Sequence, residues 1–593
     1  MHEKLHLALI QSGELVMDYM QKYSDWLNDP LLDPSDIQEL ESIADNREEI
    51  EDRFYQDLEF GTAGLRGKIG VGTNRMNKYI IMKVTQGLAN FINTFGEEEA
   101  SRGVAIAYDC RHFSVEFSET AASVLAGNGI KVYLFEGLRP TPELSFAVRH
   151  FNAQSGIVVT ASHNPKDYNG YKVYWDDGAQ ILDDVAKPLM AGIADISSLS
   201  QVKSVEFEEG KKSGLIRIIG EEIDKIYIDK VKTLTLRDSN INKNISVVYT
   251  PLNGTGNIPV RRVLSERGFT NIHVVPEQEN PDGDFTTVGY PNPEDTKAFA
   301  YAEKLGKKLD AKLLMATDPD CDRLAIMVRD NNDHYVALNG NQTGALLIHY
   351  LLSGLKEQNR LPENGAIIKS IVTGDFGRDI ARDFGVETVE VLTGFKNICG
   401  KINEFNETGS FTYLFGYEES IGYNAAEFVR DKDAVMAAML LVEMAAYWDQ
   451  RGKSLLDLMD DLFQKHGYYK EKLISLVREG ISGKKLIDKM MSGYRNSYPQ
   501  SLGKSALVSY TDYQNSITHD FKNNRETVVN DIPKSNVLRF FFDDGSWYAL
   551  RPSGTEPKIK LYMYSKAETE EEATLKLEDM EKVVFAKLES FEE

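Results

Sequence analysis

The sequence of 593 residues has few cysteines, no excess of positive charge and no long apolar run. Its three cysteines, Cys110, Cys321 and Cys399, are widely spaced and form no CxxC pair. That pattern argues against a disulfide scaffold and against a zinc site. Lys and Arg total 67 against 91 Asp and Glu, a formal net charge of −24. Because a field of this sign repels nucleic acid and anionic membrane surfaces, we expect neither as a partner.

A membrane anchor and a secretion signal are also missing from the pattern. The longest apolar stretch of helical character, residues 434–442, stops at Glu443, well short of the ~18 residues that suggest a membrane span. The start, Met1-His2-Glu3-Lys4, lacks the basic-then-apolar layout of a signal peptide. We therefore expect a soluble cytoplasmic protein, in which any anionic substrate is met by local positive charge.

Short apolar runs alternate with longer amphipathic segments over the first three-quarters of the chain. Residues 104–108, 156–160, 245–249 and 366–368 are examples. Continuous apolar runs closed by polar or glycine-bearing loops are typical of strands covered by helices, which predicts an α/β fold. In such sheets ligands gather at the carboxyl ends of strands, so the loops after these runs are the places to look for chemistry.

The last part of the chain has a different pattern. Residues 537–542 and 546–550 flank Asp543-Asp544-Gly545, a hairpin signal. A further strand at 559–564 and an amphipathic helix at about 570–588 complete a small α+β domain. The polar, helix-like stretch 451–534 is expected to be a hinge or insertion, and the charged stretch 206–212 and the Gly/Pro/Asn-rich stretch 279–293 to be surface connections. The expected domains are 1–205, 206–325, 326–455 and 456–593.

The first loop with chemical potential is Thr160-Ala161-Ser162-His163-Asn164-Pro165, directly after a predicted strand. A serine at a strand end, next to His and Asn, is a candidate nucleophile or phosphate carrier. No GxSxG elbow accompanies it, so a hydrolase triad is not supported. The alternative is an ordinary turn in which Ser162 and Asn164 bond to the backbone.

The second loop, Asp318-Pro319-Asp320-Cys321-Asp322-Arg323, places three carboxylates between two apolar runs. Each close pair of carboxylates costs about 4 kcal/mol at ~4 Å and an effective dielectric of 20. A buried loop of this kind needs a divalent cation, and oxygen-only ligands favour Mg²⁺. The alternative is a solvated acidic turn.

The third and fourth loops carry groups that suit sugar hydroxyls and phosphate. In Gly416-Tyr417-Glu418-Glu419-Ser420-Ile421-Gly422, a carboxylate and a hydroxyl can hydrogen-bond to vicinal sugar hydroxyls; the alternative is an acidic helix N-terminus. In Arg551-Pro552-Ser553-Gly554-Thr555-Glu556-Pro557-Lys558, a guanidinium fork, two hydroxyls and approachable backbone amides make an oxyanion cradle. Its alternative is a Pro/Gly turn.

Two further segments extend the same theme. Residues 61–67 offer backbone amides and Arg66 without matching a P-loop. Lys172 follows Ser162 closely enough for a returning strand to bring it back to the same site. By itself it also fits a solvated strand lysine.

The four loops, in this order (TASHNP, DPDCDR, GYEES, RPSGTEPK), resemble those of the α-D-phosphohexomutase superfamily, and the long bacterial phosphoglucomutase/phosphomannomutase branch in particular. The resemblance covers most of residues 40–450 and 535–593. It implies three similar α/β domains with mixed, helix-covered sheets and a smaller C-terminal α+β domain, arranged around a central cleft. Residues 455–530 match weakly and inherit nothing from it.

The resemblance also implies residue roles. Ser162 would carry the phosphoryl group, and Asp318, Asp320 and Asp322 would bind Mg²⁺ together with it. The other implied site residues are Arg66, His163, Lys172 and Arg323 near the reacting phosphate, Glu418 and Ser420 on sugar hydroxyls, Arg551, Ser553, Gly554 and Thr555 on the second phosphate, and, more loosely, Lys396 on the substrate. The motif leaves open whether His163 or Lys172 is the general base. Pro319 and Cys321 replace the commoner glycines between the metal ligands.

The implied activity is the interconversion of glucose 1-phosphate and glucose 6-phosphate through glucose 1,6-bisphosphate, by a monomer or weak homodimer acting on small sugar phosphates. Mannose or pentose phosphates are alternative substrates, because epimers differ at one hydroxyl. A sugar phosphatase with an aspartyl nucleophile is the rival enzyme. A catalytically silent sugar-phosphate-binding protein is the third alternative.

Overall fold

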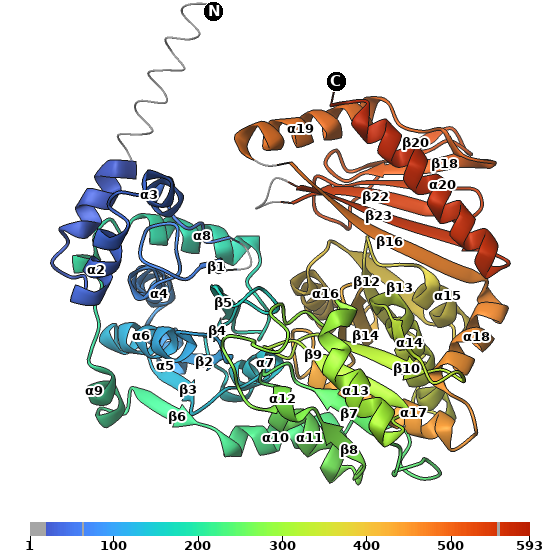
Figure 1. Ribbon diagram of the computed structural model, residues 1–593, viewed down its shortest axis with the longest axis horizontal. Coiled ribbons are helices and arrows are strands. Elements are labelled where there is room, and N and C mark those ends of the chain that lie inside the picture. The colour runs from blue at the N-terminus through green and yellow to red at the C-terminus, as the bar shows by residue number, and fades with distance from the viewer. Residues whose placement is uncertain (1–18, 62–63, 479, 554–557, 593) are drawn as a thin grey trace, which may run out of the picture. The chain divides into compact units, whose positions relative to one another are not determined.

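The computed structural model describes residues 19–61, 64–478, 480–553 and 558–592 (Figure 1). By its internal contacts the chain divides into two compact units. Unit 1 comprises Met1–Leu338 and Gly422–Gln450, and unit 2 comprises Asn339–Ile421 and Arg451–Glu593. The chain therefore passes between the units three times, and each unit is built from segments far apart in sequence.

Unit 1 begins with a small helical layer and a six-stranded mixed sheet. Helices α2 (Pro34–Ser42) and α3 (Arg47–Phe54) share a core with Tyr79 of α4. The sheet order is β1-β5-β4-β2-β3-β6. Its strands are β1 (Leu65–Lys68), β2 (Val104–Tyr108), β3 (Val132–Phe135), β4 (Ser155–Val159), β5 (Tyr168–Trp175) and β6 (Ile216–Ile219). Strands β4, β2, β3 and β6 run parallel, whereas β1, β5 and β4 are antiparallel neighbours.

Helices cover this first sheet. Helix α4 packs against α6 and α8, and α7 packs against β2 and β4. The helices are α4 (Lys78–Asn93), α5 (Glu97–Arg102), α6 (Ser114–Gly127), α7 (Thr141–Phe151), α8 (Asp183–Ala194) and α9 (Phe207–Lys212), with a 3-10 turn at Leu199–Gln201. All five residues of β2 and of β4 are buried, as expected for central strands of a helix-covered sheet.

A second, five-stranded sheet in unit 1 has the order β11-β10-β9-β7-β8. Its strands are β7 (Val247–Thr250), β8 (Ile272–Val274), β9 (Leu313–Thr317), β10 (Leu324–Arg329) and β11 (Tyr335–Leu338). Strands β8, β7 and β9 are parallel, and β9, β10 and β11 form an antiparallel meander. Its helices are α10 (Glu221–Lys232), α11 (Asn257–Glu266), α12 (Pro276–Glu279) and α13 (Ala300–Leu309), with a 3-10 turn at Thr296–Phe299.

The segment that returns to unit 1 supplies β15 (Gly422–Asn424) and α17 (Ala434–Asp449). Helix α17 packs on β9, β10 and α11, and it is buried from Ala434 to Ala446. The apolar run at 434–442 is thus a core helix. Among the described residues, no helix combines the length and apolar character that crossing a membrane requires.

Unit 2 contains a parallel sheet and a larger antiparallel sheet. In the first, β12 (Gly365–Ser370) lies between β13 (Glu387–Val391) and β14 (Thr412–Glu418), with α14 (Gly340–Glu357), α15 (Phe376–Asp383), α16 (Phe395–Thr408) and α18 (Leu455–His466). In the second, the order is β16-β23-β22-β21-β18-β19-β20, with β17 beside β18. Its elements are β16 (Tyr468–Val477), β17 (Ser501–Leu502), β18 (Ser505–Asp512), β19 (Ile517–Asp520), β20 (Arg525–Val528), β21 (Leu538–Phe542), β22 (Trp547–Pro552), β23 (Lys558–Ala567), α19 (Gly480–Asn496) and α20 (Glu570–Glu589).

The predicted fold class is confirmed: three α/β regions with mixed or parallel sheets precede a C-terminal α+β region. The prediction that 451–534 is helix-like is wrong over much of its length, because five strands, β16–β20, lie there. Strand β16 pairs with β23 over ten residues, from Tyr468↔Ala567 to Val477↔Lys558. This long-range pairing overrides the helix preference of a Lys- and Glu-containing sequence.

A group of four charges, three of them buried and Glu390 half-buried, joins the two sheets of unit 2. We call Lys369, Asp375, Glu390 and Arg539 the linking cluster. Lys369 on β12 lies 2.8 Å from Glu390 and 3.0 Å from Asp375, and Arg539 on β21 lies 2.9 Å from Glu390. The Arg539 guanidinium also lies 4.1 Å from the ring centroid of Trp547. Two cations therefore balance two carboxylates in this cluster, and the half-exposed Arg378 also pairs with Asp375 at 3.1 Å.

Candidate active site

Ser162 lies in the turn that follows β4. Its backbone is left-handed, with a φ of 51°, and it is held by a hydrogen bond from its N–H to Thr160 Oγ1 (2.8 Å). Its hydroxyl donates to Asp318 Oδ2 at 2.7 Å and lies 3.2 Å from His163 Nδ1. The alternative of a plain turn with Ser162 bonded to the backbone is therefore wrong: the hydroxyl is aimed at the acidic loop, Asp318–Arg323. A non-glycine residue with positive φ at such a position is a strained backbone of the kind found at functional sites.

Arg111 holds the serine loop in this shape. Its guanidinium donates to the carbonyls of Ser162 and Asn164, both at 2.6 Å, and to those of Pro165 (2.8 Å) and Tyr168 (3.1 Å). Asp109 pairs with Arg111 at 3.2 Å and also accepts the Thr160 hydroxyl. Sequence reasoning missed this pair. The available signal was an Asp and an Arg just after the strand parallel to β4.

The acidic loop joins β9 to β10, and all three of its carboxylates are buried. Asp318 and Asp320 have no exposed surface and Asp322 has 2%, so the alternative of a solvated acidic turn is wrong. Cys321 takes a left-handed φ of 53°, and the N–H of Arg323 donates to Asp318 Oδ1 at 3.0 Å. One oxygen from each of the three carboxylates lies within 4.8 Å of the other two. These residues could hold a metal ion.

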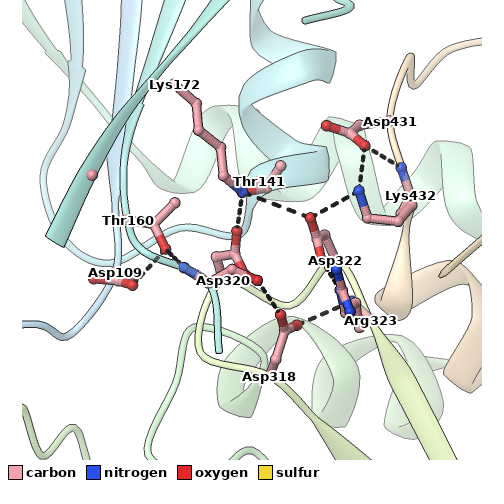
Figure 2. Close-up of polar contacts among 12 residues, drawn as sticks. Asp109, Thr141, Thr160, Lys172, Asp318, Asp320, Asp322, Arg323, Asp431 and Lys432 are labelled. Carbon is pink, nitrogen blue, oxygen red and sulfur yellow. Dashed lines mark hydrogen bonds and ion pairs between the residues drawn. The ribbon is translucent and has the colours of Figure 1, made fainter. Parts of the chain in front are cut away.

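Lysine, threonine and arginine groups contact the carboxylates, and Asp318 and Asp320 contact each other (Figure 2). Lys172 donates to Asp320 Oδ2 at 2.7 Å and lies 3.8 Å from Asp322 Oδ2, while the Thr141 hydroxyl donates to Asp320 Oδ2 at 3.0 Å. Oδ1 of Asp320 and Oδ1 of Asp322 are buried and accept no hydrogen bond from the described residues. Buried oxygens without partners are costly. An oxygen-preferring divalent cation would satisfy them, so the donor set fits Mg²⁺.

The pKa values of the acidic loop reflect the same excess of negative charge. Burial, Asp320 and Asp322 raise the pKa of Asp318 well above its usual range. Burial would also raise the pKa of Asp320, but Lys172 lowers it. Without a further cation the loop thus prefers to keep a proton on Asp318, which is the expected behaviour of crowded carboxylates.

The other residues predicted near the reacting phosphate lie around Ser162. Strand β5 returns antiparallel to β4, which brings Lys172 to the acidic loop as predicted. Arg66 on β1 donates to Asn164 Oδ1 at 3.3 Å, and Arg323 Nε lies 3.8 Å from Asp322 Oδ1. Burial and the charges of Arg323 and Arg66 lower the pKa of His163. Burial opposes the charge of Lys172, but Asp320 and Asp322 raise its pKa.

A segment predicted to be only a surface connection also contacts the serine loop. Asp284 lies 3.0 Å from Lys166 and 3.3 Å from His112. The Tyr290 ring meets the His163 ring edge to face, with centroids 6.2 Å apart. Residues 279–293 thus tie the second sheet of unit 1 to the loop after β4.

In unit 2, the predicted sugar-binding residues cluster at the end of β14. Glu418 is the last residue of that strand, so the alternative of a helix N-terminus is wrong. It is buried and accepts the N–H of Gly394 at 2.7 Å. Gly394 is also the N-cap of α16, whose second residue is Lys396. Ser420 follows in the turn and is half-buried.

The predicted phosphate-binding residues lie at the end of β22. Arg551 donates to the Tyr562 hydroxyl at 3.4 Å, and the N–H of Ser553 donates to the carbonyl of Lys558 at 2.8 Å. Burial raises the pKa of Tyr562. The charges of Glu419 and Glu418 raise this pKa further, whereas Arg551 lowers it. The ends of β14 and β22 therefore adjoin one tyrosine within unit 2. The predicted contacts of Gly554 and Thr555 lie outside the described residues.

Comparison with known proteins gives four family-model matches in chain order. They are described as phosphoglucomutase/phosphomannomutase alpha/beta/alpha domain I (residues 57–200), domain II (225–331), domain III (339–466) and C-terminal domain (515–582). Among curated relatives, phosphoglucomutase of Staphylococcus epidermidis is 39% identical over 518 residues, covering 87% of this chain and 92% of the relative. Phosphoglucomutase of Staphylococcus aureus is 38% identical over 539 residues, covering 90% and 95%.

Solved structures share the fold at lower sequence identity. The open form of the Paramecium phosphoprotein pp63/parafusin, a phosphoglucomutase, has a TM-score of 0.67 at 18% identity, covering 91% of this chain and 96% of that one. A phosphoglucomutase/phosphomannomutase family protein from Burkholderia thailandensis has a TM-score of 0.62 at 19% identity, covering 88% and 96%. With four successive domain matches and relatives this similar over most of its length, the chain belongs to the phosphoglucomutase/phosphomannomutase family.

Proposed function

We propose that the protein interconverts glucose 1-phosphate and glucose 6-phosphate through a phosphoserine at Ser162 and a glucose 1,6-bisphosphate intermediate. The observation that carries this proposal is the 2.7 Å hydrogen bond from the Ser162 hydroxyl to Asp318, beside carboxylate oxygens that accept no hydrogen bond from the described residues. A serine in that place can hold a phosphoryl group against a cation. Curated relatives named phosphoglucomutase support the choice of sugar.

Asp318, Asp320, Asp322 and the Ser162 oxygen are the proposed ligands of Mg²⁺. When bound, the ion neutralises charge on the transferring phosphoryl oxygens. Lys172 and Thr141 both donate to Oδ2 of Asp320, so Oδ1 is the oxygen that we propose for binding the ion. Phosphoryl transfer depends mostly on such positioning and charge neutralisation.

The proposed reaction exchanges one oxygen–phosphorus bond for another in each half. The 6-hydroxyl of glucose 1-phosphate attacks the phosphoryl group, the bond to Ser162 Oγ breaks, and a base takes the hydroxyl proton. The bisphosphate then reverses, and its 1-phosphoryl group returns to Ser162 Oγ while the sugar oxygen regains a proton. His163 and Lys172 are the candidate acid–base groups, and Arg66 and Arg323 are proposed to bind the phosphoryl oxygens.

We assign the rest of the substrate to unit 2. Glu418 and Ser420 are proposed to hold sugar hydroxyls, Lys396 to contact the substrate, and Arg551, Ser553, Gly554 and Thr555 to bind the phosphate that is not being transferred. Because these last residues would recognise phosphate and not the sugar, both orientations of the bisphosphate can bind. The four proposed domains are 1–205, 206–325, 326–455 and 456–593. The enzyme is proposed to act in the cytoplasm as a monomer or weak homodimer.

A coupled assay tests the proposal. Wild type should convert glucose 1-phosphate to glucose 6-phosphate with Mg²⁺, and glucose 1,6-bisphosphate should increase the rate. Ser162→Ala should lose turnover while keeping its fold by circular dichroism. Equal rates for mannose or ribose 1-phosphate would favour phosphomannomutase or phosphopentomutase activity instead, and turnover by Ser162→Ala would refute the phosphoserine.

The aspartyl phosphatase alternative makes a different prediction. It needs one carboxylate as nucleophile, but both oxygens of Asp318 accept hydrogen bonds, from Ser162 and from the Arg323 N–H. Release of inorganic phosphate at the rate of substrate loss would support the phosphatase. The mutase should instead return all phosphate as sugar phosphate.

A further inference from the structure

Lys432 contacts the acidic loop from a segment that none of the four loops contains. This segment, Arg430–Asp433, connects β15 to α17. Lys432 Nζ lies 3.1 Å from Asp322 Oδ2 and 3.0 Å from Asp431 Oδ1, and its side chain is 10% exposed. Figure 2 shows Lys432 and Lys172 reaching Asp322 from different parts of the chain. A second ammonium group is thus buried against a proposed metal ligand.

Three neighbours fix the position of Lys432. Asp431 accepts both its Nζ and its backbone N–H on Oδ1, while the other oxygen of Asp431 accepts the Tyr174 hydroxyl at 2.7 Å. A Cβ added to Gly422 would lie 2.2 Å from Lys432 Cδ, so the lysine stem lies directly on that glycine. These contacts hold the ammonium group in a defined place.

The charges around Lys432 leave an excess of negative charge that a cation would offset. Asp318, Asp320, Asp322 and Asp431 contribute four carboxylates, and Lys172, Lys432 and Arg323 contribute three positive charges. Lys432 occupies Oδ2 of Asp322, while Oδ1 accepts no hydrogen bond from the described residues. It therefore offsets the charge of the ligand without filling the ligand's open oxygen.

We infer that Lys432 is a resident counter-ion that lowers the affinity of the site for its divalent cation; the inference rests on the proposed metal site. Two effects of removing Lys432 oppose each other. Loss of an orienting hydrogen bond to a ligand weakens metal binding by about 10- to 100-fold. Loss of a positive charge within about 8 Å of a divalent cation strengthens binding by about 1,000-fold or more at an effective dielectric of about 20. The electrostatic effect is the larger one.

The test is a titration of the protein with Mn²⁺ alone, with free Mn²⁺ measured by electron paramagnetic resonance and no sugar present. Lys432→Met should bind Mn²⁺ at least about tenfold more tightly than wild type, the net of the two effects. Lys432→Arg keeps the charge and should stay within about threefold. Lys187→Met is the matched control, because Lys187 is 74% exposed and pairs only with Asp183 on its own helix among the described residues.

Turnover gives a second readout. With less positive charge to meet the phosphoryl group, kcat of Lys432→Met should fall while its metal affinity rises; a merely structural role would lower both. Should the Met variant fail to fold, Lys432→Gln carries the same expectation. Unchanged or weaker Mn²⁺ binding would overturn the inference. The proposed function is judged separately by turnover of Ser162→Ala, which the Mn²⁺ titration does not involve.

Discussion

Two buried groups of charges in this molecule look alike in composition and differ in balance. In the linking cluster of unit 2, Lys369 and Arg539 equal Asp375 and Glu390 in number, and Arg378 also pairs with Asp375 at 3.1 Å. In unit 1, the three carboxylates of the acidic loop and Asp431 outnumber their three cations, Lys172, Lys432 and Arg323. The first arrangement has no excess of negative charge. The second keeps an excess of negative charge, which a further cation would offset.

The pKa shifts of Glu390 and Asp318, one carboxylate from each group, run in opposite directions. Burial would raise the pKa of Glu390, but Arg539 and Lys369 lower it. Burial raises the pKa of Asp318, and Asp320 and Asp322 raise it further. A buried carboxylate with a full partner stays charged, whereas one crowded by others does not. Charge balance therefore distinguishes the linking cluster, which joins two sheets, from the acidic loop, which we propose binds a cation.

The largest expected effect is on catalysis, in the unbalanced cluster. Asp318→Asn keeps the size of the side chain and one acceptor oxygen for the Arg323 N–H, turns an amide donor toward Ser162 Oγ and removes one negative ligand. Activity with Mg²⁺ should fall by roughly 10³-fold or more, because the ion supplies several kcal/mol of charge stabilisation. The thermal midpoint without metal should stay the same or rise, since repulsion is relieved. A lower midpoint with retained Mg²⁺ dependence would mean that the carboxylate is structural.

The matched change in the balanced cluster should affect stability instead. Glu390→Gln leaves Arg539 and Lys369 short of a partner, and breaking a buried ion pair costs about 3 kcal/mol or more. Urea unfolding monitored by circular dichroism would measure the loss. Mn²⁺ affinity should match wild type. Altered metal binding would show that the two clusters are not independent.

A third prediction concerns a buried carboxyl that forms no ion pair among the described residues. Asp433 caps α17 by accepting the Met436 N–H at 2.9 Å, and burial raises its pKa to about 6. The folded protein therefore binds this proton more tightly than the unfolded chain, whose aspartate has a pKa near 4. The contribution of Asp433 to stability should fall by about 3 kcal/mol as pH rises from about 4 to 6.

The control is Asp433→Asn, because an asparagine side chain cannot titrate and can still cap the helix. Urea unfolding of this variant across about pH 4 to 7 should lose most of that decline, so the variant should gain on wild type as pH rises. A difference that is constant with pH would contradict the shifted carboxyl.

The smallest effect is expected at Thr141, which is fully buried and donates to Asp320 Oδ2. Thr141→Val keeps the shape and removes about 1 kcal/mol of hydrogen bonding to the ligand, so Mn²⁺ affinity should drop about fivefold. The same Mn²⁺ titration measures it. If binding is unchanged, the orientation of Asp320 depends on Lys172 alone.

The sequence identified the parts of the site that are local in the chain. Ser162, the three carboxylates and Glu418 each follow a strand whose apolar run is visible in one dimension, and the structure places them at those strand ends. The position of Lys172 near Ser162 could also be predicted, because antiparallel strands joined by a short loop pair with each other.

The parts that could not be predicted depend on pairing between distant segments. Arg111 binds carbonyls of the serine loop only because β2 lies beside β4, and Lys432 reaches Asp322 from the segment before α17. The sequence of β16 looks helical because its Lys and Glu residues occur in both helices and strands. Its pairing with β23 makes it a strand. None of these contacts leaves a periodic signal in its own segment.

The central claim is that Ser162 carries a phosphoryl group beside a cation held by the acidic loop. Its most direct test is intact-mass analysis of wild type after incubation with glucose 1,6-bisphosphate and Mg²⁺, followed by peptide mapping and hydroxylamine treatment. We predict one added phosphoryl group, mapped to Ser162 and stable to hydroxylamine. A hydroxylamine-labile phosphoryl group on Asp318, or no adduct at all, would contradict the account.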